Sequence, residues 1–82
     1  MNEILVRVIA EQAAFLELSG NNVVDADSAV VQLESMASAL QRLSLDEQHQ
    51  FARATGRLAE EQRDAARADF FRNLPDQLGL SR

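Results

Sequence analysis

The sequence contains no cysteine, no tryptophan and no tyrosine, and only one proline and three glycines occur among its 82 residues. Without cysteine the chain can form no disulfide, no thiolate nucleophile and no cysteine-ligated metal site. So few glycines and prolines supply little of the turn chemistry that a multi-stranded β-fold needs. The thirteen alanines instead favour helices, so the sequence predicts an all-α protein.

Long apolar runs and an excess of positive charge are also missing. No stretch of about twenty apolar residues is present that could span a membrane, and the N-terminal segment lacks the basic region of a signal peptide. Thirteen acidic residues against eight arginines give a net charge of −5. Phosphate backbones and anionic lipids attract basic surfaces. We therefore expect a cytoplasmic protein that binds neither nucleic acid nor a membrane.

A chain of this length supports one domain with one core. Apolar periodicity and end signals predict helices over about residues 2–18, 25–43, 45–67 and 69–74. Asn2 and Asp25 are the predicted N-caps of the first two helices, and Ser44 with Glu47 forms the capping-box pattern of the third. The predicted fold is a small antiparallel bundle of three long helices plus a short C-terminal helix or turn.

The segment 25–43 has the most regular pattern in the chain. One face of it holds eight apolar residues: Ala26, Ala29, Val30, Leu33, Met36, Ala37, Leu40 and Leu43. Such a continuous stripe predicts a scaffold helix that is covered by the first and third helices. The capping box follows directly, so the second and third helices are expected to form an antiparallel hairpin.

The first predicted helix also has one broad apolar face. It holds six large residues: Ile4, Leu5, Val8, Ile9, Phe15 and Leu16. Gln12 falls in the middle of this face. A buried amide needs partners, so Gln12 is expected to bond a neighbouring helix or to lie at a rim; the alternative is a contact inside a groove.

Two features complicate the C-terminal half. The polar run 60–64 resembles a linker, yet the charged and alanine faces continue through it in helical phase, which predicts a third helix reaching residue 67. Gly56 marks either a close helix crossing or a weak point in that helix. The phase shifts near Asp69, and Pro75 is expected to stop a short helix at about residue 74.

No residue pattern in the chain indicates catalysis or a cofactor. His49 is the only histidine, and Asp25 and Asp27 are interpreted as helix caps because the remaining ligands of a calcium loop are absent. A nucleophile elbow, a phosphate loop and a zinc-binding helix motif are also absent. The sequence therefore predicts no catalytic, cofactor-binding or metal-binding residues, and a protein that is not an enzyme.

The remaining hypothesis is non-enzymatic binding of another protein. Small acidic helical proteins of bacteria often neutralise a partner, as immunity proteins, antitoxins or secretion chaperones do; this comparison rests on size and charge alone. Two groups of residues are the candidates. The C-terminal apolar cluster that would anchor the partner consists of Phe70, Phe71, Leu74 and Leu78. The acidic positions that would attract a basic partner are Glu60, Glu61 and Asp64.

Other interpretations of the same residues stay open. The C-terminal cluster can instead dock between the first two helices and close the core. The chain can also be a homodimer that buries Phe71, Val31 or the alanine face of the third helix. A third alternative is a small ligand held between helices with Gln12 as its polar contact.

Overall fold

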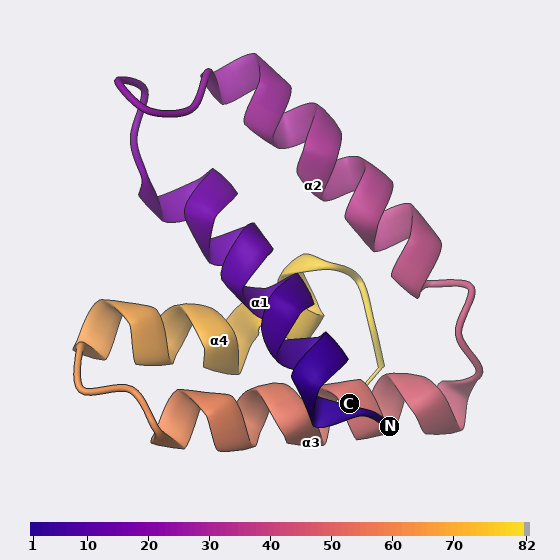
Figure 1. Cartoon of the computed structure of the whole chain (residues 1–82). Helices are drawn as coiled ribbons and strands as arrows, with labels where there is room; N and C mark the ends of the chain where they lie inside the picture. The colour runs from indigo at the N-terminus through magenta and orange to yellow at the C-terminus, as the bar shows by residue number, and fades with distance from the viewer. Residues whose placement is uncertain (82) are drawn as a thin grey trace.

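The computed structural model describes residues 1–81, which form four helices joined by short turns (Figure 1). The helices are α1 (Glu3–Leu18), α2 (Ala26–Leu40), α3 (Leu45–Glu60) and α4 (Ala65–Gln77). No strand occurs among these residues, so the all-α prediction is confirmed. The arrangement of three long helices and one short one differs from the structure, because the four helices have 16, 15, 16 and 13 residues.

The predicted N-caps are present where the sequence placed them. The Asn2 side chain accepts hydrogen bonds from the backbone N–H groups of Ile4 and Leu5 at the start of α1. Asp25 caps α2, and Ser44 and Glu47 form the complete capping box of α3. These bonds satisfy N–H groups that have no partner inside a helix, so they define where each helix begins.

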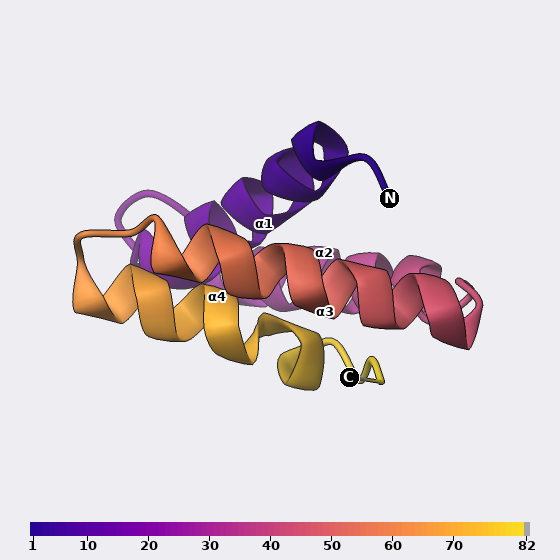
Figure 2. The same ribbon diagram turned by 90° about the horizontal axis from the view of Figure 1, so that it is seen from below.

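The prediction that the third helix reaches residue 67 was wrong. α3 ends at Glu60, and the backbone turns before Asp64, whose side chain accepts a 2.9 Å hydrogen bond from the N–H of Arg67 as the N-cap of α4. A continuous helix would carry Phe70 and Phe71 beyond the body of the protein. Turning the chain brings α4 back alongside α3 (Figure 2), where both rings are buried.

Pro75 does not stop the last helix, as the sequence suggested it would. It lies inside α4, where its ring is buried and only one backbone donor is lost near the helix end. α4 instead ends before Gly79, which has a φ of +71°, a value that glycine adopts at little steric cost. The carbonyl of Pro75 then accepts a 2.8 Å hydrogen bond from the N–H of Leu80, which reverses the chain.

The core lies between the antiparallel α3–α4 pair and α1, which crosses them (Figures 1 and 2). Its largest fully buried side chains are Phe51 from α3 and Phe71 and Leu74 from α4. α1 contributes one buried face of small residues: Val6, Ala10, Ala13 and Ala14. Small side chains let the α1 backbone approach the other two helices closely.

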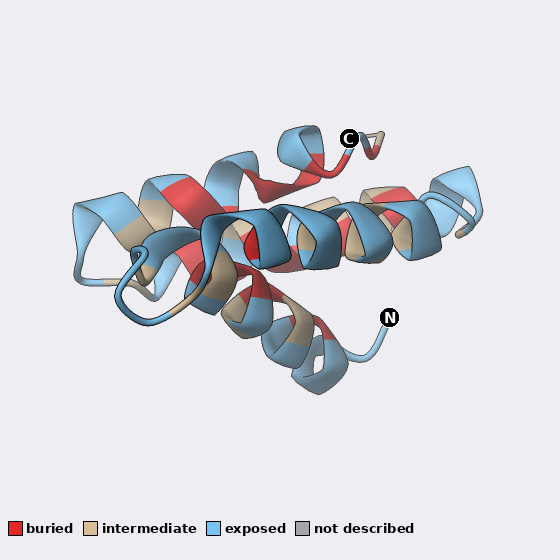
Figure 3. Ribbon diagram, turned by 90° about the horizontal axis from the view of Figure 1, so that it is seen from above, coloured by how far each residue is buried: buried red, intermediate tan, exposed pale blue. Residues whose placement is uncertain are grey.

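α2 is not the scaffold that its regular pattern suggested. Ala29 is its only buried residue, and its larger apolar residues Leu33, Met36 and Leu40 are only partly buried against the core (Figure 3). The helix packs more closely on α1 than on α3, so the predicted α2–α3 hairpin is also wrong. The capping box sets where α3 begins, but it does not set the angle between the two helices.

Two glutamine side chains tie the turn after α2 to the C-terminal segment. The Nε2 of Gln41 donates a 2.8 Å hydrogen bond to the carbonyl of Leu78. The buried Gln48 donates to the carbonyls of Gln41 and Leu43, and its Oε1 accepts from the N–H of Ser81. These amides hold the end of the chain against the α2–α3 turn.

Replacing Phe71 by alanine should reduce the free energy of unfolding by about 3–5 kcal/mol, because a fully buried ring leaves a cavity in the core. Leu33→Ala should cost less than about 2 kcal/mol, below the usual range for a buried leucine, because Leu33 is only partly buried. Urea denaturation of both variants measures the difference. Equal losses would contradict the central position of α4 in the core.

Alanine at Gly56 should stabilise the protein by about 0.5–1 kcal/mol, because Gly56 is helical and a Cβ there would meet nothing within 4 Å. Gly79→Ala should destabilise it by at least about 1–2 kcal/mol, since φ is positive and the new Cβ would lie 2.8 Å from Nε2 of Gln41. Gly20→Ala is the matched control, with a φ of +78° and no nearby atom. Thermal melts should rank the melting temperatures as Gly56→Ala highest, then Gly20→Ala, then Gly79→Ala. A different order would contradict the interpretation of these glycines.

Candidate functional site

The structure places the C-terminal apolar cluster inside the protein. Phe70, Phe71, Leu74 and Leu78 are all buried, and the two rings meet edge-on with centroids 5.7 Å apart. The cluster therefore closes the core, as the alternative expected, but it packs with α3 and α1 and does not dock between α1 and α2. In this conformation the four side chains contact the chain's own core and offer no surface to a partner.

The three acidic candidates are exposed near the turn between α3 and α4, and two of them already bind within the chain. Glu61 accepts a 2.8 Å hydrogen bond from Arg7, which raises the pKa of the Arg7 guanidinium. Asp64 caps α4. Glu60 is exposed at the last turn of α3. An acidic patch made of these three residues would therefore compete with contacts that they make inside the protein.

Several of the exposed large apolar side chains lie on α1. Ile4 is 73% exposed, Leu5 60%, Val8 54% and Phe15 49%. These four residues form the outward face of α1, because the buried Val6, Ala10, Ala13 and Ala14 occupy the opposite side of the helix. The face that the sequence suggested as core is therefore the solvent-facing one.

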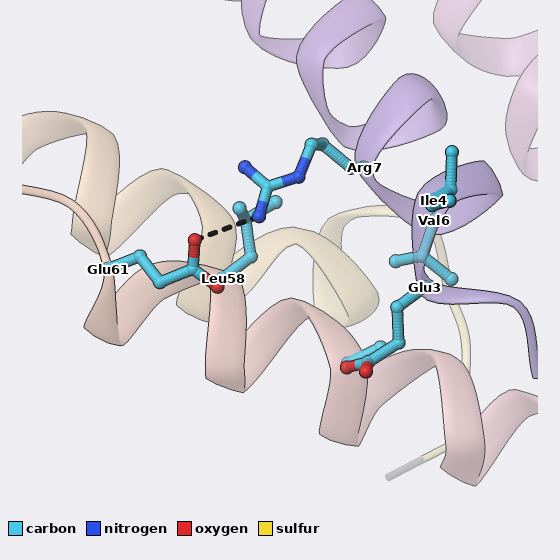
Figure 4. Close-up of a pocket in the computed structure, with 7 residues that line it drawn as sticks. Glu3, Ile4, Val6, Arg7, Leu58 and Glu61 are labelled. Carbon is cyan, nitrogen blue, oxygen red and sulfur yellow. Dashed lines mark hydrogen bonds and ion pairs between the residues drawn. The ribbon is translucent and has the colours of Figure 1, made fainter.

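Three ion pairs hold α1 in this orientation. Glu3 accepts a hydrogen bond from Arg57 of α3, and Arg7 donates to Glu61 (Figure 4). Half-exposed pairs of this kind contribute little to stability individually, but all three tether the same side of α1. Figure 4 also shows Ile4 directed away from α3.

The third ion pair is the best buried of the three. Arg67 of α4 binds both carboxylate oxygens of Glu11, at 2.7 and 2.9 Å. Its guanidinium carbon also lies 5.2 Å from the centroid of the Phe71 ring, in cation–π geometry. Every charged side chain between residues 3 and 11 is thus paired with α3, α4 or the turn between them. Glu11 itself lies at the spacing of the exposed row, seven residues after Ile4 and four before Phe15, so the outward face of α1 carries one carboxylate, which Arg67 neutralises.

A groove of about 470 Å³ runs beside this face, between α1 and α2. Its lining residues are Gln12, Phe15, Leu16, Gln32, Ser35, Met36 and Ala39. The exposed amide of Gln12 lies at this groove, as both interpretations of that residue allowed. The polar side chains that line it are amides and a hydroxyl, which donate and accept hydrogen bonds but do not titrate near neutral pH.

The depression between α1 and α3 is smaller. It measures about 160 Å³, below the roughly 300–1,000 Å³ of small-molecule sites, and the Arg7–Glu61 pair lies along it (Figure 4). Within residues 1–81, no three metal-ligating side chains come together. None of the four helices in this part of the chain is both long enough and apolar enough to cross a lipid bilayer.

The sequence contains a signal for the orientation of α1 that we weighted too lightly. Val6, Ala10, Ala13 and Ala14 follow the spacing of a helical stripe as closely as the larger residues do. α1 is therefore apolar on two sides, and ranking residues by size selects the wrong side as the core.

Comparisons of the chain with protein-family models, with curated proteins and with solved structures found no match, so the assignment of a function rests on the geometry of the α1 surface.

Proposed function

We propose that the protein is a non-enzymatic protein-binding domain and that the outward face of α1 is its binding surface. The observation that carries the proposal is the row of large apolar side chains, Ile4, Leu5, Val8 and Phe15, each about half exposed or more. Exposed residues at positions 4, 8 and 15 repeat at helical spacing, so they lie on one side of α1, with Glu11 and its ion pair to Arg67 between Val8 and Phe15.

The size of the stripe supports a protein partner. If a fully exposed large side chain presents about 150–200 Å², the four residues expose on the order of 400 Å². Isolated surface leucines or valines are common, but contiguous apolar patches of this size mark interaction sites. Covering 400 Å² would contribute about 10 kcal/mol at 25 cal/mol per Å² before the entropic cost of association is subtracted.

The charges near the stripe indicate which kind of contact it makes. Glu3, Arg7 and Glu11 are paired with α3, α4 or the turn between them, so a partner on the outward face meets apolar groups, the Gln12 amide and one neutralised carboxylate, Glu11. Association through such a surface is driven by burial and depends weakly on salt. A basic partner attracted to Glu60, Glu61 and Asp64, the earlier hypothesis, would instead be released at high salt.

The double substitution Val8→Ser with Phe15→Ser should abolish retention of a stoichiometric protein by the tagged chain, because it removes the centre and one end of the stripe. The retained protein, whether a second copy or another species, should bind the unsubstituted chain equally at 50 mM and at 500 mM salt. This increase in salt shortens the screening length of charge interactions by about threefold. Retention is measured by affinity capture and gel densitometry.

Val31→Ser serves as the control, since Val31 is 60% exposed on α2 and lies outside the α1 stripe. Because the substituted positions are exposed, circular dichroism should show similar melting for all variants. If the α1 variant retains as much protein as the Val31 variant, the outward face of α1 is not the binding surface. Loss of retention at high salt alone would favour the acidic positions.

A further inference from the structure

We infer that the occupant of the outward face of α1 is a second copy of the chain, whose own α1 lies antiparallel across it about a two-fold axis. This inference rests on the proposed function, because it names the partner of the same surface. Of the surfaces that the sequence suggested for a homodimer, Phe71 and the alanines of α3 at positions 54 and 59 are buried in the core, whereas Val31 is exposed on α2.

The single chain exposes more surface than its mass predicts. A compact monomer of 9.1 kDa has an accessible surface of about 4,900 Å², whereas this chain has 5,225 Å². The excess arises where α1 presents its large side chains and where α2 buries only Ala29.

The α1 face has the area that a symmetric dimer needs. Met1 and Leu18 extend the stripe at its two ends, at 47% and 45% exposure, and Gln12 and Leu16 border it. Together these residues bring the face to on the order of 700 Å², close to the roughly 800 Å² that each partner buries in a stable complex. An isologous dimer uses the same patch twice, so one stripe supplies both sides.

Charge favours this patch over the rest of the surface for self-association. Two copies with a net charge of −5 repel each other, and the repulsion is smallest where neutral side chains meet. The ion pair of Glu3 lies toward α3, and the carboxylate of Glu11, the one charged group at the spacing of this face, is neutralised by Arg67.

The direction of pairing follows from the ends of α1. In a parallel pair, the two negative C-terminal ends of α1 would lie together. In an antiparallel pair, the negative end of each α1 lies beside the positive N-terminal end of the other. The same arrangement places Ile4 of each copy opposite Phe15 of the other, so an aliphatic side chain packs against an aromatic ring at each end of the interface.

This register predicts specific separations between equivalent residues. With Ile4 opposite Phe15 of the second copy, the two-fold axis crosses α1 between residues 9 and 10. At a rise of 1.5 Å per residue, the two Val8 residues are offset by about 4–5 Å along the helices and the two Ile4 residues by about 16 Å. The Cα–Cα distance of each pair combines this offset with the separation of the two helices, so the Ile4 pair lies far beyond the roughly 4.4–6.8 Å that a disulfide spans, whereas the Val8 pair lies much closer to it.

The absence of cysteine makes the arrangement directly testable, since a single introduced thiol can cross-link only between chains. Val8→Cys should give a dimer on a non-reducing gel, and Ile4→Cys alone should not. A mixture of Ile4→Cys with a differently tagged Phe15→Cys chain should give the mixed dimer. Val31→Cys, equally exposed on α2, is the control for random collision. The unsubstituted chain should scatter light as a particle of about 18 kDa, twice 9.1 kDa.

Each contrary outcome overturns a defined part of the inference. Cross-linking of Ile4→Cys alone would overturn the antiparallel direction, and cross-linking of Val31→Cys as fast as Val8→Cys would overturn the α1 interface. A monomer by light scattering that still captures another protein through α1 would overturn the second copy as occupant but leave the proposed function standing. If the chain is a monomer and the Val8→Ser, Phe15→Ser variant still captures the same protein, both the dimer and the proposed function are contradicted.

Discussion

The packing of α4 back onto α3 is the constraint on which the rest of the structure depends. It buries Phe71 and Leu74 with Phe51 and so creates the apolar surface on which α1 packs. The turn that permits it is local, because Asp64 caps α4 four residues after α3 ends. Once the hairpin exists, α1 and α2 can only pack on its outside.

α1 binds this hairpin through its small residues because they give the closest backbone approach. Ala10, Ala13 and Ala14 are essentially inaccessible to solvent, while Ile4 and Val8 on the other side remain exposed. Three ion pairs, from Glu3, Arg7 and Glu11 at successive four-residue steps along one flank of α1, resist rotation of the helix. The outward apolar face is therefore a consequence of how α1 is tethered, and it is the basis of the proposed binding surface.

Much of the local structure could be predicted from the sequence, whereas the packing could not. The helix class and the caps at Asn2, Asp25 and Ser44 depend on neighbouring residues and were predicted correctly. The roles of α2 and of the segment 60–64 were misjudged for one reason. Periodicity measures how well a segment could bury a face, but not whether a competing surface is available to bury it.

The sequence by itself determined that this chain is helical, where three of its four helices begin and that no cysteine chemistry occurs, because these properties depend on composition and on contacts within a few residues. Only the tertiary structure decided which side of α1 faces the core and whether the pair Phe70 and Phe71 lies inside or outside. Those outcomes depend on competition between surfaces far apart in the chain. The face of α1 that remains outside the core is the proposed binding surface.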